Sequence, residues 1–256
     1  MRVPIQAGNW KMNKTVGEAV DLVRELNRLL ADVGGVEVVV CPPFVALAAV
    51  ADALKGTPIK VGAQNMHWEA KGAFTGEVSP AMLKGLCDYV IIGHSERRQY
   101  FGETDETVNR KVKTALAHGL IPIMAVGESL QQYEANQTAE VVSSQVRNGL
   151  AGITAHQARG IVIAYEPVWA IGTGKAATGE GANRVVAQSV RGTLAALYGE
   201  EVAQTIRVQY GGSVTPANIA EFMTQADLDG GLVGGASLKA NDFAEIVKAT
   251  AKAKGK

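Results

Sequence analysis

The chain has 256 residues, a length that suits one or two domains, and 47% of its residues are hydrophobic. Its 25 basic and 25 acidic residues give a formal net charge of zero. The chain therefore lacks the excess of basic residues typical of proteins that bind nucleic acid or a membrane surface, and we expect neither partner.

Targeting signals and disulfide patterns are absent from the sequence. The first residues lack the apolar core of a signal peptide, and the longest apolar run, residues 38–51, is interrupted by Pro42 and Pro43. Cys41 and Cys87 form no CxxC motif and are too few for a disulfide scaffold. We therefore expect a cytoplasmic protein with free thiols.

Short apolar runs rich in β-branched residues recur along the chain and predict strands. In chain order they cover residues 3–7, 36–41, 59–63, 89–92, 121–126, 161–164, 206–210 and 232–233. Helical periodicity fills the intervals; for example, Val20, Val23, Leu26 and Leu30 lie on one helix face. Continuous apolar strands indicate burial on both sides and hence a parallel sheet.

Eight strand–helix units in a chain of this length favour an α/β fold with a closed (β/α)8 barrel over an open sheet. Residues 1–250 are predicted to form this single domain, and residues 251–256 a flexible basic tail. The last strand has the weakest signal, because glycines surround its only two apolar residues.

Polar and titratable residues follow several of these strands, at the ends where barrel enzymes assemble their sites. Asn9 and Lys11 follow the first strand, His94 the fourth and Glu166 the sixth. An amide, a cation, an imidazole and a carboxylate at one mouth are the groups that proton abstraction beside a carbonyl requires.

Each of these residues also has an ordinary structural interpretation, such as a solvated lysine or a helix-capping asparagine. The functional hypothesis makes Glu166 a general base, while Asn9 and Lys11 hold a carbonyl oxygen. A helix beginning after His94 would disfavour the charged ring and leave a neutral imidazole able to donate to that oxygen. Glu96, in the first turn of that helix, either serves the helix dipole or joins the charge network.

Glycine clusters follow the seventh and eighth strands. Gly211–Ser213 and Gly234–Gly235 stand where barrels commonly bind phosphate through backbone N–H groups, although tight turns alone would also explain them. Gly172–Lys175 lacks the first glycine of a P-loop, and no GxGxxG motif is present, so nucleotide binding is unsupported. No cluster has metal-ligand spacing, and we expect no metal.

The chain resembles the triosephosphate isomerase family in seven motifs that follow in order. They are Gly8–Lys11, Gly62–Asn65, Gly72–Glu77, Ile92–Arg98, Ala164–Lys175, Tyr210–Ser213 and Leu232–Leu238. The resemblance implies a single-domain TIM barrel that acts without a cofactor. It also implies the interconversion of dihydroxyacetone phosphate and glyceraldehyde 3-phosphate, small phosphorylated trioses of glycolysis and gluconeogenesis, through an enediolate.

The resemblance also implies roles for individual residues. Glu166 would move a proton between two carbons, neutral His94 would move protons between oxygens, and Lys11 and Asn9 would stabilise the enediolate. The implied phosphate donors are Gly172, Ser213, Gly234 and Gly235. The implied lid comprises Pro167, Val168, Trp169, Ala170, Ile171, Gly172, Thr173, Gly174, Lys175, Ala176 and Ala177. A homodimer is implied, with an interface that includes Gln64, Asn65, Phe74, Thr75, Gly76, Glu77 and Arg98.

Three positions depart from the family pattern. Ala125 replaces a usual cysteine, which predicts altered packing near the base. Residues 132–136 replace a common Arg and Gly pair, which removes a local salt bridge. Gly179 stands where a proline often opens a helix and predicts a looser helix start.

Other functions fit the sequence less well. A Schiff-base aldolase would need a lysine buried within a strand, and Lys11 lies beyond its strand. Another sugar-phosphate isomerase, acting on a larger substrate, is nearer in chemistry, but the lid motif favours a small substrate. A non-catalytic phosphate-binding barrel has no use for a base opposite the phosphate glycines.

Overall fold

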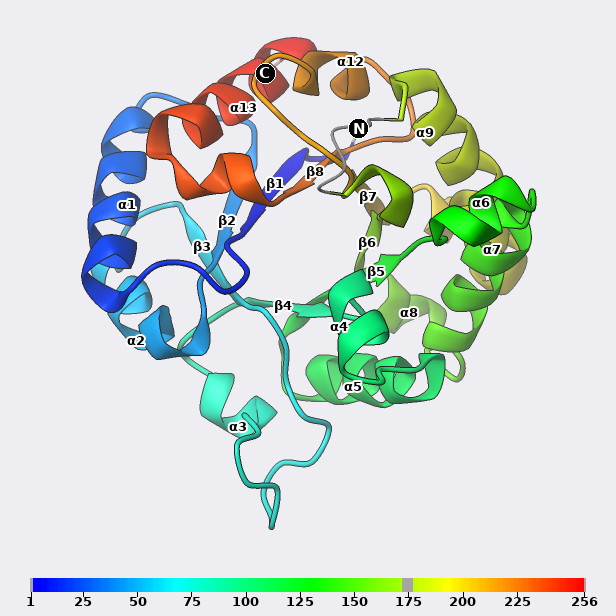
Figure 1. The fold of residues 1–256 in the computed structure, drawn as a ribbon, viewed down its shortest axis with the longest axis horizontal. Helices are drawn as coiled ribbons and strands as arrows, with labels where there is room; N and C mark the ends of the chain where they lie inside the picture. The colour runs from blue at the N-terminus through cyan, green and yellow to red at the C-terminus, as the bar shows by residue number, and fades with distance from the viewer. Residues whose placement is uncertain (1, 172–176, 256) are drawn as a thin grey trace.

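The computed structural model describes residues 2–171 and 177–255, in which eight parallel strands close into a barrel ringed by helices (Figure 1). Each strand pairs with the next along the chain, and the eighth pairs with the first. The strands are β1 (Ile5–Asn9), β2 (Glu37–Cys41), β3 (Lys60–Ala63), β4 (Tyr89–Ile92), β5 (Ile121–Val126), β6 (Val162–Tyr165), β7 (Arg207–Tyr210) and β8 (Gly230–Val233). The predicted (β/α)8 barrel is confirmed.

The core forms two layers, because the strands bury residues on both of their faces. Ile91 and Ile123 belong to the cluster inside the barrel, and Val90 and Met124 belong to the layer under the helices. This alternation explains the continuous apolar runs of the sequence.

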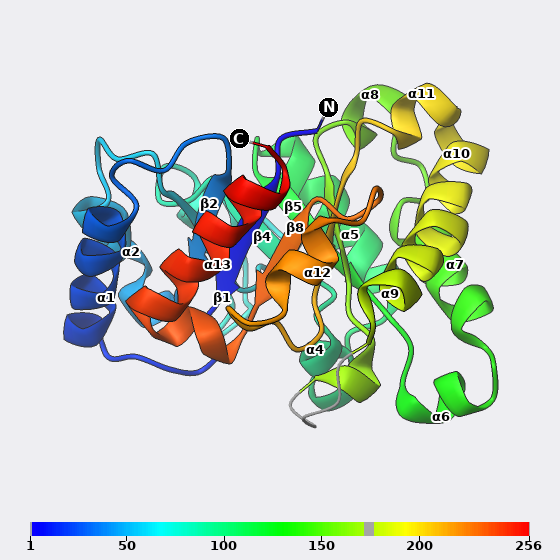
Figure 2. The ribbon, with the colours of Figure 1, turned by 90° about the horizontal axis from the view of Figure 1, so that it is seen from above.

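Helices connect successive strands and cover the outer face of the barrel (Figures 1 and 2). In the first, the Thr15 side chain accepts the backbone N–H of Glu18 in a capping box, and Val23 and Leu26 are buried. Val20, predicted on the same face, is half-buried. The α-helices are α1 (Val16–Leu29), α2 (Phe44–Ala53), α3 (Pro80–Leu83), α4 (Ser95–Tyr100), α5 (Asp105–Ala117), α6 (Leu130–Glu134), α7 (Thr138–Gly149), α8 (Ala155–Ala158), α9 (Gly179–Val185), α10 (Gly192–Tyr198), α11 (Glu200–Ala203), α12 (Ile219–Met223) and α13 (Ala240–Ala253). Helical segments of other types are η1 (Val168–Ala170), η2 (Val186–Arg191) and η3 (Gly235–Leu238).

Strand β8 begins two residues before its predicted start. A Cβ atom on Gly230 would lie 1.7 Å from the carbonyl oxygen of Ile5 on β1, so only glycine fits at this seam. The glycines that weakened the sequence signal are therefore part of the strand and allow the barrel to close.

The predicted C-terminal tail starts too early. Helix α13 continues to Ala253 and ends on the side of the molecule where β1 begins (Figure 2). The next residue, Lys254, donates from Nζ to the carbonyl oxygen of Gln225 at 2.9 Å. Residues 251–253 are thus helical, which overturns the flexible tail for that part.

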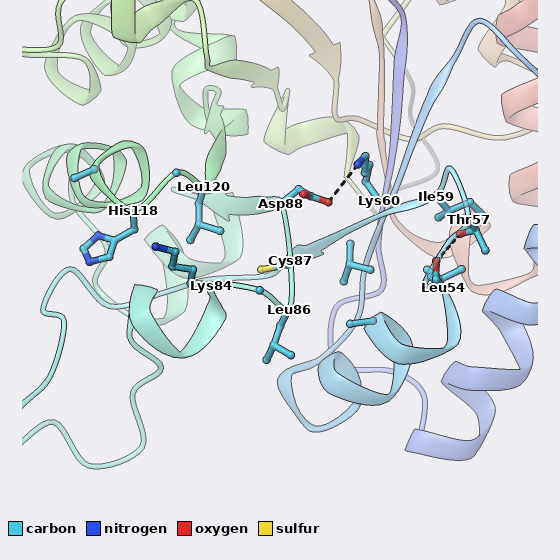
Figure 3. Close-up of a pocket in the computed structure, with 15 residues that line it drawn as sticks. Leu54, Thr57, Ile59, Lys60, Lys84, Leu86, Cys87, Asp88, His118 and Leu120 are labelled. Atoms are coloured by element: carbon cyan, nitrogen blue, oxygen red, sulfur yellow. Dashed lines mark hydrogen bonds and ion pairs between the residues drawn. The ribbon is translucent and has the colours of Figure 1, made fainter.

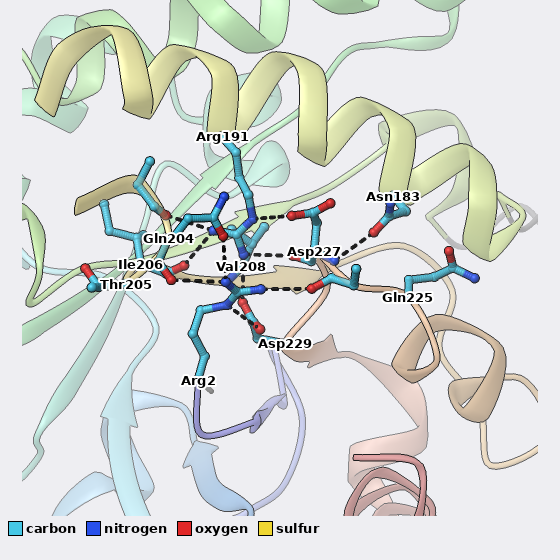
Figure 4. A network of polar contacts seen from close by, with 12 residues as sticks. Arg2, Asn183, Arg191, Gln204, Thr205, Ile206, Val208, Gln225, Asp227 and Asp229 are labelled. Atoms are coloured by element: carbon cyan, nitrogen blue, oxygen red, sulfur yellow. Dashed lines mark hydrogen bonds and ion pairs between the residues drawn. The ribbon is translucent and has the colours of Figure 1, made fainter. Parts of the chain in front are cut away.

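A polar network lies where the last strands begin (Figure 4). Arg191 on η2 pairs with Asp227 at 2.8 Å and with Asp229 at 3.0 Å, and Arg2 pairs with Asp229 at 2.7 Å. The Arg191 and Asp229 side chains are almost fully buried, and each buried charge has an opposite charge beside it. The network ties the segment before β1 to the segment before β8.

Across the described residues, no helix has both the length and the apolarity needed to span a membrane.

Candidate active site

A cavity of about 360 Å3 opens at the carboxyl ends of the strands. Five strand ends contribute most of the predicted site residues to its wall. These residues are Asn9, Lys11, His94, Glu166, Ser213, Gly234 and Gly235. Gly172, predicted to join them, lies outside the described residues.

Glu166, the predicted base, is 2% exposed and follows β6 directly. Its backbone N–H donates to the carbonyl oxygen of Val126 at 2.7 Å. Carboxylate Oε2 accepts the backbone N–H of Ser95 at 3.0 Å, and Oε1 lies 3.1 Å from His94 Nε2. The carboxylate is therefore held at the mouth, beside the predicted imidazole.

Two glycines make room for this glutamate. A Cβ atom on Gly211 would lie 2.7 Å from the Glu166 Cγ atom, and one on Gly127 would lie 1.7 Å from the Glu166 carbonyl oxygen. Gly211 belongs to the predicted phosphate cluster, yet its absent side chain also leaves space for the base. Gly127 was not singled out, because one glycine after a strand gives no distinguishing signal.

His94 is buried and caps helix α4. Its Nδ1 accepts the backbone N–H of Glu96 at 3.2 Å, which assigns this nitrogen as the acceptor and Nε2 as the N–H nitrogen of a neutral ring. The Nε2–H faces the cavity side that Glu166 occupies. A neutral imidazole in this orientation can donate a hydrogen bond to a substrate oxygen.

Lys11 adopts a left-handed backbone conformation, with φ at 52°, which is uncommon for a lysine. Its N–H donates to Asn9 Oδ1 at 3.1 Å, and its carbonyl oxygen accepts the Gln64 side-chain amide at 2.8 Å. Lys11 Nζ lies 2.6 Å from Glu96 Oε1. Glu96 is not among the residues that line the 360 Å3 cavity, and this contact with Lys11 brings it beside the mouth.

A buried ion pair supports this side of the mouth, and the sequence analysis missed it. Lys111 Nζ donates to Glu103 Oε1 and to Asn65 Oδ1, both at 2.8 Å, and Arg97 pairs with Glu103 at 2.9 Å. Burial lowers the pKa of Lys111, while Glu103 opposes that shift. The available signal was the position of Lys111 next to Val112 on the apolar face of α5.

The described ends of the predicted lid are anchored to residues at the ends of the two strands that flank β6. Trp169 donates from Nε1 to Glu128 Oε1 at 2.8 Å, and the Ala177 N–H donates to the Tyr210 hydroxyl at 3.3 Å. Burial raises the pKa of the Glu128 carboxyl, and hydrogen bonds from Trp169 and other donors oppose this effect. Lid residues Gly172, Thr173, Gly174, Lys175 and Ala176 lie outside the described residues.

The departure at Gly179 has a structural reason. The Gly179 N–H donates to Glu221 Oε1 at 2.5 Å, a bond that proline could not form. Thr178 caps the helix by accepting the Gly181 N–H at 3.1 Å. The start of α9 is therefore held by two hydrogen bonds.

The segment between β3 and α3 projects from the barrel (Figure 1). Phe74 is 43% exposed, and Thr75, Gly76 and Glu77 are exposed with it. Other residues of the predicted interface turn inward. Asn65 and Gln64 bond within the chain, as above, and Arg98 bonds to Asp105 at 2.6 Å and to the Gly93 carbonyl oxygen at 2.8 Å.

The opposite end of the barrel holds a different kind of cavity, of about 650 Å3 (Figure 3). Lys60 and Asp88 point toward one another there, with 3.9 Å between Nζ and Oδ2. His118 bonds through Nδ1 to the carbonyl oxygen of Thr114 in its own helix. None of the contacts described in the wall of this cavity pairs a carboxylate with an imidazole, as Glu166 and His94 do at the mouth.

Fold and mouth together define a (β/α)8-barrel enzyme built to move protons within a small ligand. Residues 4–250 match the family model described as triosephosphate isomerase, and the chain belongs to this family. Proteins named triosephosphate isomerase from Clostridium perfringens and Caldanaerobacter subterraneus subsp. tengcongensis are 59% and 60% identical, each over 96% of this chain and 99% of the relative. The protein of that name from Carboxydothermus hydrogenoformans is 58% identical over 97% of this chain and 99% of its own length.

Proposed function

We propose that Glu166, His94, Lys11 and Asn9 carry out the proton transfers of the triosephosphate isomerase reaction in this chain. The reaction interconverts dihydroxyacetone phosphate and glyceraldehyde 3-phosphate, as membership of the family indicates. The observation that carries the assignment is the contact between Glu166 Oε1 and His94 Nε2, at 3.1 Å within the mouth.

In the first step, the Glu166 carboxylate removes a proton from the carbon beside the substrate carbonyl. Negative charge then develops on the carbonyl oxygen. The His94 Nε2–H, the Asn9 amide and the Lys11 ammonium group stabilise this charge in the resulting enediolate. Protonated Glu166 returns the proton to the neighbouring carbon, while His94 moves protons between the two oxygens.

The glycine-rich ends of β7 and β8 hold the substrate phosphate in this proposal. Ser213, Gly234 and Gly235 line the same cavity as the base, and η3 begins at Gly235. Backbone N–H groups at the start of such a turn suit an anion. A phosphate bound there would leave the carbon end of a three-carbon substrate facing Glu166.

The segment from Pro167 to Ala177 serves as the lid that excludes water from the enediolate. Its support is the location of its described ends. It starts directly after the base, and the Ala177 N–H bonds to the Tyr210 hydroxyl at the end of β7. Exclusion of water matters because a reactive intermediate exposed to solvent undergoes side reactions.

A coupled assay of triose phosphate interconversion, in both directions, tests the function. We expect turnover that is abolished in a Glu166→Gln variant. Inorganic phosphate binding without turnover would instead support the non-catalytic barrel, and turnover restricted to larger sugar phosphates would support the other isomerase.

The active form is proposed to be a homodimer in the cytoplasm. A groove of about 290 Å3 adjoins the mouth and is lined by Lys11 and His94 together with the apolar side chains of Met12 and Phe101. Met12 is 95% exposed and Phe101 67% exposed, and exposed apolar side chains that gather in one patch are typical of surfaces that bind a partner. In a two-fold dimer, the loop that carries Thr75 in each subunit would fill the groove of the other.

The cytoplasmic part of the proposal is supported by the two free cysteines, Cys41 and Cys87, which suit a reducing compartment.

Replacing Thr75 by Arg tests this dimer. The charged side chain should be excluded from the groove, so the dimer should dissociate and kcat should fall although no group in the proton path has changed. Sedimentation and activity are measured together on this variant and on a Thr224→Arg control, which carries the same change at an exposed site on another surface. A fully active monomer would refute the proposal.

A further inference from the structure

Helix α6 lies against η1, the short turn that follows the base. Its Tyr133 ring stacks on the Trp169 indole, with ring centroids 4.5 Å apart and the planes 30° from parallel. Tyr133 occupies the segment in which this chain departs from the usual Arg and Gly pair. The stack is therefore a feature of this chain that the sequence analysis left without a role.

Trp169 is the point where two separate contacts meet. One face of its indole is covered by Tyr133, and its Nε1–H donates to Glu128 at 2.8 Å. Glu128 is fully buried, and its carbonyl oxygen accepts the Val168 N–H at 3.0 Å. The indole thus joins η1 to the β5–α6 connection from both its edge and its face.

The helix that carries the stacking ring is itself fixed at both ends. Ser129 and Gln132 form a capping box at its start. At its end, Asn136 takes a left-handed conformation, with φ at 57°, which asparagine tolerates better than most residues. Gln137 then donates its N–H to the carbonyl oxygen of Gln132 at 2.9 Å. Tyr133 is therefore presented by a pre-formed turn.

We propose that Tyr133 is a positioning residue, which stacks on Trp169 and thereby holds η1 in the arrangement that keeps the Glu166 carboxylate in the mouth. The inference rests on the proposed function of Glu166. Only two residues separate Glu166 from Trp169, so a displacement of the indole is transmitted through a short, proline-containing segment to the base.

The expected effect is modest and specific. A stacked aromatic pair shifts an equilibrium between two arrangements by about 2- to 10-fold. Without the stack, a correspondingly smaller fraction of the enzyme holds the base in place. The value of kcat should fall by up to that factor while KM changes less, because the phosphate glycines follow β7 and β8, away from α6.

The test compares Tyr133→Leu, which removes the aromatic ring, with Tyr133→Phe, which keeps it. Each protein is labelled with 5-fluorotryptophan, and the Trp169 fluorine resonance is assigned with Trp169→Phe. We expect the Leu variant to shift or broaden this resonance and to lower kcat, while the Phe variant retains the wild-type resonance and rate.

Three results would overturn the proposal: an unchanged Trp169 resonance in the Leu variant, a shifted resonance with wild-type kcat, or a Phe variant that behaves like the Leu variant. Failure of the proposed function is distinguishable, because it would show as a wild-type enzyme without isomerase activity, whereas the fluorine spectra still report whether Tyr133 holds the indole.

Discussion

Gly211→Ala is a direct perturbation of the base, because this glycine gives the Glu166 side chain its space. The added Cβ atom would lie 2.7 Å from Glu166 Cγ, about 0.7 Å closer than ordinary carbon contacts of roughly 3.4 Å. Gly211 has no positive φ, so the alanine backbone itself is not strained. The substitution therefore acts by moving the carboxylate away from its partners.

A displacement of the reacting group by ~1 Å can lower the rate on the order of 10²-fold, so we expect kcat to fall by about 10- to 100-fold. KM should change far less. Overpacking should also lower the free energy of unfolding by about 1–3 kcal/mol, which denaturant titration would measure. Gly17→Ala in α1, where no atom lies within 4 Å of the new methyl group, serves as the matched control. A folded Gly211→Ala enzyme with wild-type kcat would refute this account of how the base is placed.

Two further predictions concern the imidazole and the lid. Nitrogen NMR of His94 at pH 8 should show Nε2 protonated and Nδ1 as an acceptor, since Nδ1 accepts the Glu96 N–H; the opposite tautomer would contradict its role as donor to the substrate. Deleting residues 171–174 should leave a folded barrel that loses the intermediate to water, so phosphate elimination should rise at the expense of isomerisation. Clean isomerisation by that variant would count against the lid.

The barrel could be predicted because each strand is buried on both faces and therefore reads as an apolar run. The exception was β8, where Gly230 is required by the close approach of Ile5 and leaves little apolar signal. The predicted flexible tail, residues 251–256, also began too early. Its lysines suggested a solvated segment, yet α13 continues to Ala253 and Lys254 bonds to the Gln225 carbonyl oxygen.

The mouth residues could be predicted because polar groups directly after parallel strands meet at one edge of the barrel. The residues that support the mouth from outside these motifs could not be predicted from the sequence. Lys111 and Glu103 lie outside the mouth motifs, and only the folded chain brings Lys111 against both Glu103 and Asn65. The contact of Glu96 with the Lys11 ammonium group could not be predicted either, because spacing alone does not tell which cation a carboxylate meets.

The central claim is that Glu166 is the base, and the kinetics of Glu166→Asp test it most directly. The change withdraws the carboxylate by one methylene group from the position that now lies 3.1 Å from His94 Nε2. We predict that kcat falls on the order of 10²-fold, while KM changes far less, because the phosphate contacts remain. A Glu166→Asp enzyme that retains kcat near the wild-type value would contradict the assignment.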